Sequence, residues 1–497
     1  MSEVLTQFKE HLKKMDAYSH ALGVLEYDSV TAMPQGGSSH LGETVGFLSG
    51  EMYKLVTDEA FKHNIEYILA HKDEFDHITF REAEELHEDM ERTAKIPMEE
   101  YVAYNVELNE ASAVWHKAKL DDDYTAFEPH LDKIVDFNRR FASYWDPNKP
   151  KYDVLLDMYE KGLSKETLEV FFNGLKKELA PMVKQIAAVK QPDDAFAHKS
   201  VPIEKQRQLS DYLMKVMTID REHCSIGETE HPFTTNFTKD DVRITTHYHE
   251  TEMFSNMFSV IHEGGHALYE LHTGDDLKGS PLGTGASMGI HESQSRFFEN
   301  IIGRSKQFIS YIYPEVQKYA PEVFEGVSAH AFYLAANVSK PSLIRTEADE
   351  LTYPFHIMIR YDIEKELIEG DLKAKDVPAL WNKLYKDYLG VEVPNDRQGA
   401  LQDSHWSGGM IGYFPSYALG SAYGAQILAH MEQEIPVWDY VSKGDLKPIV
   451  DWLSNRIYRY GKLLTPKELI RNACGEPFDP SYYIRYLKEK YSEIYSL

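Results

Sequence analysis

The sequence predicts a mainly α-helical protein with one small β element, and three observations carry this prediction. From the start to about residue 225, apolar residues recur at spacings of three and four, which is the period of an amphipathic helix. Residues 241–248 alternate apolar and polar side chains, as a strand does. From residue 341 to the end the helical spacing returns, interrupted by a glycine- and aromatic-rich stretch at 391–423.

The first 225 residues are expected to form several helices joined by short breaks. Two breaks, at residues 33–39 and 145–153, are rich in residues that favour turns. Residues 165–189 repeat leucine and phenylalanine along one helical face. The charges of the acid-rich segment 81–96 are expected to lie on a solvated outer face.

Residues 241–248 predict a strand immediately before the next helix. In a mostly helical chain a single strand would lie with an extended edge beside that helix, and a peptide could pair with such an edge. The strand places Val242, Ile244, Thr246 and Tyr248 on one side and Arg243, Thr245 and His247 on the other.

The pentapeptide HEGGH at residues 262–266 lies in this next helix. Positions i and i+4 share a helical face, so His262 and His266 can both bind one metal ion. Glu263 is rotated by about 100° from His262, which lets it accept a proton from a water held at the ion without binding the ion itself. By chance alone, about one chain in ten of this size would contain the pattern, so its context has to be considered.

The surrounding residues favour a metal site. Each of the two adjacent glycines costs about 1 kcal/mol relative to alanine inside a helix, which indicates that another backbone approaches closely. Met253, Met257, Phe258 and Ile261 form an apolar stripe, so the helix is expected to be buried and its histidines to need polar partners.

Catalytic zinc usually has three protein ligands and one position left for water. A loop with five glycines follows the HEGGH helix and leads into another predicted helix, which begins near HESQS at residues 291–295. Glu292 in this segment can be the third ligand. Residue type alone does not choose between it and the alternatives, which are His291, His249, Glu250 and His272.

The composition excludes several classes of partner. The chain of 497 residues carries 80 acidic and 53 basic side chains, and its net charge of −27 repels nucleic acid. It contains no apolar run of about 18 residues that could span a bilayer, and its start does not resemble an export signal. The only cysteines, Cys224 and Cys474, have no metal-binding or redox spacing, so a cytoplasmic location is expected.

The sequence closely resembles the carboxypeptidase Taq family of zinc metallocarboxypeptidases over essentially its whole length. Six signature blocks of this family occur in order. They are HPF at 231–233, DVRIT at 241–245, HEGGH at 262–266, HESQ at 291–294, IRTEAD at 344–349 and GALQDSHW at 399–406.

The resemblance implies which side chains form the site. His262, His266 and Glu292 are expected to hold one ion per subunit, usually Zn²⁺, which Co²⁺ or Mn²⁺ could replace. Glu263 is expected to be the general base and acid. The resemblance also implies a homodimer.

The fold implied by the resemblance is a saddle-shaped or clam-like helical zincin, similar to neurolysin, with a deep central groove. Residues 1–497 are then one catalytic unit. Its approximate parts are a helical N-terminal region at 1–230, the active-site blocks at 231–430 and C-terminal helices at 431–497.

An exopeptidase must also bind the terminal carboxylate of its substrate, and a guanidinium group suits this geometry best. Arg345 is the first choice, although an ion pair with Asp349 on a solvated helix face is the alternative interpretation. Arg243 is the second choice for the anchor. Oxyanion donors are sought in or next to the blocks, among residues that could equally be turn or core residues: His231, His405, Tyr413, Tyr417 and Tyr423.

The expected function is a cytoplasmic metallocarboxypeptidase that releases single amino acids, with broad specificity, from peptides with a free C-terminus. An oligopeptidase or peptidyl-dipeptidase is the alternative, since the same zinc chemistry serves both. A helical binding protein with a structural metal is a third interpretation. It is disfavoured because structural zinc sites are often built from cysteine, and none lies near the histidines.

Overall fold

The fold is mostly helical, as predicted, in a computed structural model that describes residues 3–497. Among these residues, no helix combines the length and apolar content that crossing a bilayer requires. The helices before the sheet are α1 (Glu3–Thr31), α2 (Ser38–Val56), α3 (Glu59–Ala70), α4 (His77–Ala94), α5 (Met98–Asp121), α6 (Tyr124–Trp145), α7 (Lys151–Tyr159), α8 (Lys165–Ala187) and α9 (Ile203–Val216).

The sheet separates these helices from the second helical half of the chain. The strands are β1 (Cys224–Glu228), β2 (Thr234–Thr238) and β3 (Asp241–Thr246). The later helices are α10 (Met253–Leu271), α11 (Met288–Arg296), the π-helix η5 (Phe297–Gly303), α12 (Lys306–Tyr319), α13 (Ala329–Ala336), α14 (Tyr353–Ile368), α15 (Val377–Leu389), α16 (Pro415–Glu434), α17 (Val437–Ser442), α18 (Lys447–Arg456), α19 (Pro466–Cys474) and α20 (Ser481–Tyr495).

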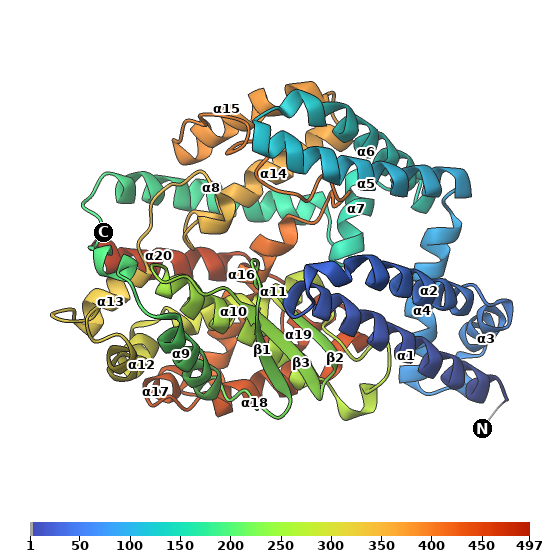
Figure 1. Cartoon of the computed structure of the whole chain (residues 1–497), viewed down its shortest axis with the longest axis horizontal. Helices are drawn as coiled ribbons and strands as arrows, with labels where there is room; N and C mark the ends of the chain where they lie inside the picture. Colours follow the sequence, from blue (N-terminus) through green and yellow to red (C-terminus); the bar gives the residue numbers. More distant parts are fainter. Residues whose placement is uncertain (1–2) are drawn as a thin grey trace.

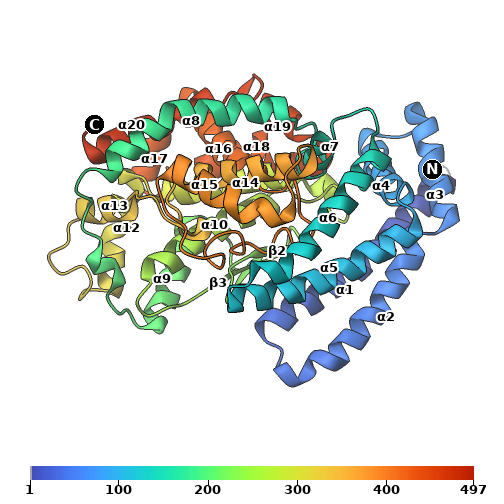
Figure 2. The ribbon, with the colours of Figure 1, turned by 90° about the horizontal axis from the view of Figure 1, so that it is seen from above.

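Helices α1 to α4 lie at one end of the molecule, opposite α12 and α13 (Figure 1, Figure 2). A large hydrophobic cluster runs from α5 to α20, whereas the N-terminal helices have a small core of their own. Helix α2 contributes nothing to this small core, because none of its residues is buried. The small core comes from α1, α3 and α4 and consists of Phe8, Leu12, Phe61, Ile65, Ile68 and Ala83.

The sheet has three strands, so the expectation of a single strand is wrong. Strand β3 is central and pairs in parallel with β1 and antiparallel with β2. Both sides of β3 are therefore occupied, and only β1 and β2 lie at the sheet edges. Val242, Ile244 and Thr246, which were predicted to share one side of the strand, are buried, but Thr245 is buried as well and Tyr248 lies beyond the strand. Thr245 is tolerated there because its hydroxyl bonds to Thr229 and to the backbone N–H of Phe233.

Glycines allow three helices to approach closely at the centre of the molecule. A Cβ on Gly265 of α10 would lie 2.6 Å from the carbonyl oxygen of Gln294 in α11. A Cβ on Gly420 of α16 would lie 2.7 Å from the side-chain carbons of Glu292. The close backbone approach predicted from the paired glycines is thus confirmed for Gly265, while Gly264 faces side chains.

The segment after α10 also forms the predicted helix, but in two parts. Residues 288–296 are α-helical and continue directly into η5. The glycine- and aromatic-rich stretch at 391–423 is only partly irregular, because α16 begins at Pro415. Tyr417 and Tyr423 are consequently helical, and Tyr413 lies in the preceding loop.

Candidate metal centre

Three side chains from two helices converge on one point. His262 and His266 of α10 and Glu292 of α11 each place a ligand atom within 4.8 Å of the others. Oε2 of Glu292 lies 3.7 Å from Nε2 of His262 and 3.6 Å from Nε2 of His266. Ligand atoms bound at about 2.1 Å to a tetrahedral ion are about 3.4 Å apart. The donor types and spacing therefore fit a divalent metal ion.

His262 is held by a carboxylate on its other ring nitrogen. Oε2 of Glu299, which lies on η5, is 2.8 Å from Nδ1 of His262. Arg296 and Arg304 contact the same carboxylate at 3.4 and 3.0 Å. Burial opposes the charge of Glu299, but Arg296, the hydrogen bond from His262 and Arg304 outweigh it and lower the pKa of Glu299. An ionised Glu299 then accepts the Nδ1 hydrogen of His262 and leaves Nε2 for a metal.

His266 is held through a second imidazole. Its Nδ1 lies 2.6 Å from Nδ1 of His291, and Nε2 of His291 lies 2.7 Å from Oε1 of Glu270. Glu270 is one turn after His266 on α10 and is buried. Both site histidines thus have an orienting partner, but the partners differ in kind.

Glu263 lies next to the three converging side chains. It is buried, and the hydroxyl of Thr234 in β2 donates to its Oε2 at 2.7 Å and to its backbone oxygen at 3.0 Å. Burial raises the pKa of Glu263, against the opposing effects of His262 and of the hydrogen bond from Thr234. The edge strand β2 therefore fixes the carboxylate relative to α10.

A cavity of about 610 Å³ opens in front of this group. His262, Glu263 and Glu292 form part of its wall, and Arg345 and Tyr417 line it further along. The cavity is thus large enough for part of a peptide and carries both acidic and basic side chains.

Arg345 lines this cavity but not in the way either interpretation of the sequence expected. It lies in a short 3₁₀ turn, is only 7% exposed, and its Nε and Nη2 donate to Oδ1 of Asp403 at 3.0 and 2.9 Å. Its Nη1 donates to Tyr353 at 3.1 Å. The alternative ion pair with Asp349 is wrong, because Asp349 is half-buried and accepts hydrogen bonds from Ser339 and Thr352.

His405 and Tyr417 form a pair beside Arg345. Nε2 of His405 is 3.1 Å from the hydroxyl of Tyr417, and the ring of Tyr413 packs against both. Burial lowers the pKa of His405 to about 4, with Asp403 opposing and Arg345 and Arg360 adding to the effect. At neutral pH His405 is therefore an uncharged partner of Tyr417.

Other residues singled out from the sequence do not line this cavity. Arg243 pairs with Asp241 and lies over the rings of Tyr27 and Phe237. Tyr423 is buried and donates to Glu160 at 3.1 Å. The remaining residues lie outside the converging group; these are His231, which is exposed, and the alternative ligands His249, Glu250 and His272.

Sequence analysis did not single out Glu299, Arg296, Thr234 or Asp403. Glu299 and Arg296 had a detectable signal, because they follow Glu292 by seven and four residues and so share its helical face. Asp403 lies within the block GALQDSHW and Thr234 directly follows the block HPF, but spacing alone gives neither residue a role. These two are brought there only by the packing of β2 and of the loop before α16.

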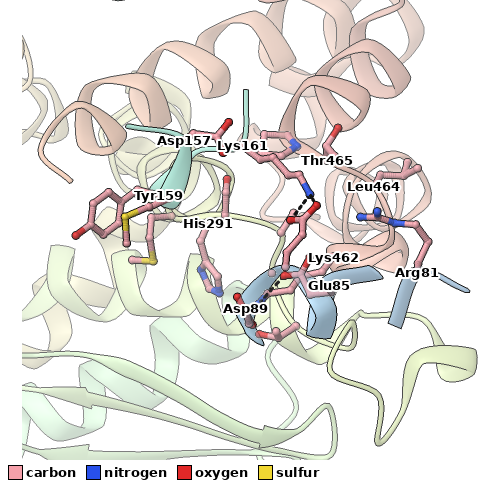
Figure 3. A pocket seen from close by; sticks show the side chains of 18 of the residues that line it. Arg81, Glu85, Asp89, Asp157, Tyr159, Lys161, His291, Lys462, Leu464 and Thr465 are labelled. Atoms are coloured by element: carbon pink, nitrogen blue, oxygen red, sulfur yellow. Dashed lines mark hydrogen bonds and ion pairs between the residues drawn. The ribbon is translucent and has the colours of Figure 1, made fainter. Parts of the chain in front are cut away.

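A second cavity, of about 410 Å³, lies between α4 and the segment before α11 (Figure 3). One face of α4 lines it with charged side chains such as Glu85 and Glu88, which are 24% and 39% exposed, so the expected solvated outer face is confirmed only in part. The charges are matched across the cavity: Lys161 with Glu88 at 2.7 Å, Lys462 with Glu85 at 3.6 Å, and Arg92 with Asp157 at 3.6 Å.

The chain is similar to one family of known proteins along nearly its whole length. The family model described as carboxypeptidase Taq (M32) metallopeptidase matches residues 7–491. Carboxypeptidase 1 of Bacillus subtilis (strain 168) is 41% identical over 99% of this chain and 98% of its own length. Thermostable carboxypeptidase 1 of Pyrococcus furiosus is 35% identical over 99% of each chain. The solved structure of M32 carboxypeptidase from Deinococcus radiodurans R1 superposes with a TM-score of 0.97 at 30% identity and covers 100% of both chains.

Proposed function

The chain belongs to the carboxypeptidase Taq (M32) metallopeptidase family and is thus a metallocarboxypeptidase. From this premise we propose that it uses a bound zinc ion to remove single C-terminal residues from peptides. The observation that carries this proposal is the convergence of His262, His266 and Glu292 beside Glu263. We further propose broad specificity for the released residue. One family model matches nearly the whole chain, which supports a single catalytic unit.

In the proposed reaction, Glu263 moves the proton. A divalent ion at this site would polarise the scissile carbonyl and make a coordinated water more acidic. Glu263 takes the proton from the attacking water and passes it to the leaving amine. Since Thr234 donates to Oε2, Oε1 is available to face the water.

Tyr417 is the proposed donor to the oxyanion. It lines the cavity, and its hydroxyl is held by His405. With an uncharged His405 whose Nε2–H donates to the phenol oxygen, the hydroxyl hydrogen of Tyr417 can turn towards the substrate.

Arg345 is the proposed anchor for the terminal carboxylate. A guanidinium group has five N–H bonds, and three of those of Arg345 are taken by Asp403 and Tyr353. One hydrogen remains on each terminal nitrogen, which is the set needed for a two-point contact with a carboxylate. On a pair of peptides that differ only at the C-terminus, Arg345→Ala should impair cleavage of the free acid much more than that of the amide. Equal effects on the two peptides would place the anchor elsewhere.

We propose a cytoplasmic homodimer as the assembled form. Helix α2 supports this, because it packs mainly on α1 and leaves Phe47 69% and Tyr53 62% exposed. Sedimentation of the wild type and of Phe47→Ser tests whether this face joins two copies.

Mass spectrometry of a peptide digest tests the function directly. With a peptide blocked at its N-terminus, single amino acids are expected to leave from the C-terminal end. Release of dipeptides or internal fragments would instead identify a peptidyl-dipeptidase or oligopeptidase. Chelator treatment should abolish hydrolysis while the fold is retained, and added zinc should restore it.

A further inference from the structure

The two histidines of the metal centre are supported by different chemistry. Nδ1 of His262 meets the carboxylate of Glu299 directly, at 2.8 Å. Nδ1 of His266 meets no carboxylate, and the imidazole of His291 stands between it and Glu270. The chain from His266 through His291 to Glu270 therefore contains two consecutive hydrogen bonds.

The direction of these hydrogen bonds follows from the tautomers. A neutral imidazole has one N–H and one lone-pair nitrogen, and a histidine that binds a cation through Nε2 keeps its hydrogen on Nδ1. Nδ1 of His266 therefore donates to Nδ1 of His291, which must carry the lone pair. The hydrogen of His291 is then on Nε2, from which it is donated to Oε1 of Glu270. The tautomer of His266 therefore fixes the tautomer of His291, and with it the direction of the hydrogen bond to Glu270.

Glu270 is held firmly enough to impose this arrangement. Its Oε1 also accepts from the hydroxyl of Thr284 at 2.9 Å and from the N–H of Gly285 at 3.1 Å. Its Oε2 accepts from the amide of Asn236 in β2 at 2.8 Å. Because Thr284, Gly285 and Asn236 all donate to it, the carboxylate of Glu270 acts only as an acceptor, and Nε2 of His291 must donate to it.

The loop before α11 is shaped around the His291 ring. A Cβ on Gly285 would overlap the Cδ2 atom of His291, so only glycine leaves room for the imidazole at this place. The side chain of His291 also borders the second cavity (Figure 3). Among residues 3–497, the ring of His291 bonds to His266 and Glu270. None of the charged side chains that line the second cavity bonds to it.

We propose that His291 and Glu270 are positioning residues that fix the tautomer and orientation of His266 for metal binding. This inference rests on the proposed metal-dependent function. His291 presents an acceptor to Nδ1 of His266, because its own N–H lies on Nε2 and is donated to Glu270. Loss of an orienting partner of this kind typically weakens metal binding by about 10- to 100-fold.

Three substitutions of His291 separate its two contacts. In His291→Asn the amide oxygen replaces Nδ1, which keeps an acceptor for His266 and loses the bond to Glu270. In His291→Gln the amide reaches the place of Nε2, which keeps the bond to Glu270 and loses the acceptor. His291→Phe loses both. The measurement is the zinc dissociation constant of the full-length apo protein by competition with a chelator, together with its thermal unfolding.

The order of zinc affinities decides the proposal. Zinc binding should be about tenfold or more weaker in His291→Phe and in His291→Gln, and within about threefold of wild type in His291→Asn. Wild-type affinity in His291→Phe, or equal losses in the Asn and Gln variants, would overturn it. If His291→Phe does not fold, the comparison of the two amides still decides.

A matched control separates positioning from general stability. His430 of α16 also bonds to a carboxylate, Glu476 at 2.9 Å, and its side chain is 18% exposed against 19% for His291. His430→Phe should lower the thermal midpoint and leave zinc affinity unchanged. A comparable loss of zinc affinity in this variant would attribute the effect to stability. Zinc binding is measured without hydrolysis, so an unexpected digest product would refute the proposed function and leave this test intact.

Discussion

Helices α2 and α10 are both 19 residues long and both contain glycines, but they differ in almost every other respect. Helix α2 has no buried residue, whereas thirteen residues of α10 are buried, including Glu263 and Glu270. A Cβ on Gly46 of α2 would meet nothing within 4 Å, while one on Gly265 of α10 would overlap the backbone of α11.

Glycine thus has opposite consequences in the two helices. In α2 the glycines only loosen the helix, because no neighbour within the same chain requires the space. In α10, Gly265 lets α11 approach until Glu292 meets the two histidines. Substitutions in the two helices should therefore differ in size and even in sign.

The largest effect is expected from Glu263→Gln on α10. The amide keeps the shape of the side chain but cannot take a proton, so kcat/KM should fall by about 10²- to 10⁴-fold while zinc binding persists. Steady-state kinetics and metal content measured on the same preparation check this. Glu204→Gln, on the exposed face of the neighbouring helix α9, should retain wild-type activity. Near-normal turnover in Glu263→Gln would reject the role of the carboxylate.

Gly265→Ala should be strongly destabilising although it adds only one methyl group. The added carbon would lie 2.6 Å from Gln294 O and 2.7 Å from Ser295 Cα, and both are backbone atoms that cannot turn away. We expect a loss of about 2 kcal/mol or more in the free energy of unfolding, together with weaker zinc binding. Thermal unfolding and chelator competition measure the two effects. A variant as stable as wild type would show that α11 can move without cost.

Helix α14 is buried like α10, and one of its carboxyl groups is expected to make stability depend on pH. Burial raises the pKa of Glu364 to about 7, against hydrogen bonds from Tyr152, Trp406 and Gly412. Because the folded pKa lies above the ordinary 4.5, the stability linked to this group is fully present below about pH 4.5 and is lost as the pH rises through 7.

In Glu364→Gln this loss should disappear. The free energy of unfolding of the wild type should fall between pH 5 and 8 by about 3 kcal/mol more than that of the variant. Urea unfolding across this range tests the difference in slope, whatever the absolute stability of the variant. Parallel curves would show that Glu364 does not titrate there.

The smallest effect, and one of opposite sign, is expected on α2. Gly46→Ala adds a methyl group in open space within a helix, so it should raise the free energy of unfolding by about 0.5–1 kcal/mol. Urea unfolding of this variant beside Gly265→Ala makes the comparison direct. A destabilised Gly46→Ala would mean that the contact proposed to join two copies at α2 extends to the position of Gly46.

The sequence was sufficient for features that depend on local spacing. The helical period, the i, i+4 histidines and the close approach at Gly265 each follow from neighbouring residues. The strands β1 and β2 were missed because they are short and mostly half-buried, with no clear alternation. Their residues become strands by pairing with β3.

Features that depend on which surface meets which could not be predicted from spacing. The charged face of α4 resembles any solvated face in sequence, and only the position of Lys161 and Lys462 makes part of it the wall of a cavity. Arg345 likewise pairs with Asp403, which lies 58 residues away, and not with the nearby Asp349. The surroundings of the α4 charges and the partner of Arg345 both depend on contacts between segments that are distant in the sequence.

The small core of α1, α3 and α4 shares no buried residue with the large hydrophobic cluster, and the contacts that join α4 to the later helices include ion pairs and the hydrogen bond from Trp145 to the backbone of Arg92. Such a division permits partial unfolding: the N-terminal helices can lose their structure while the histidine helix stays intact. Amide hydrogens of α3 should therefore exchange with deuterium long before those of α10, and this difference should widen as salt weakens the charged contacts.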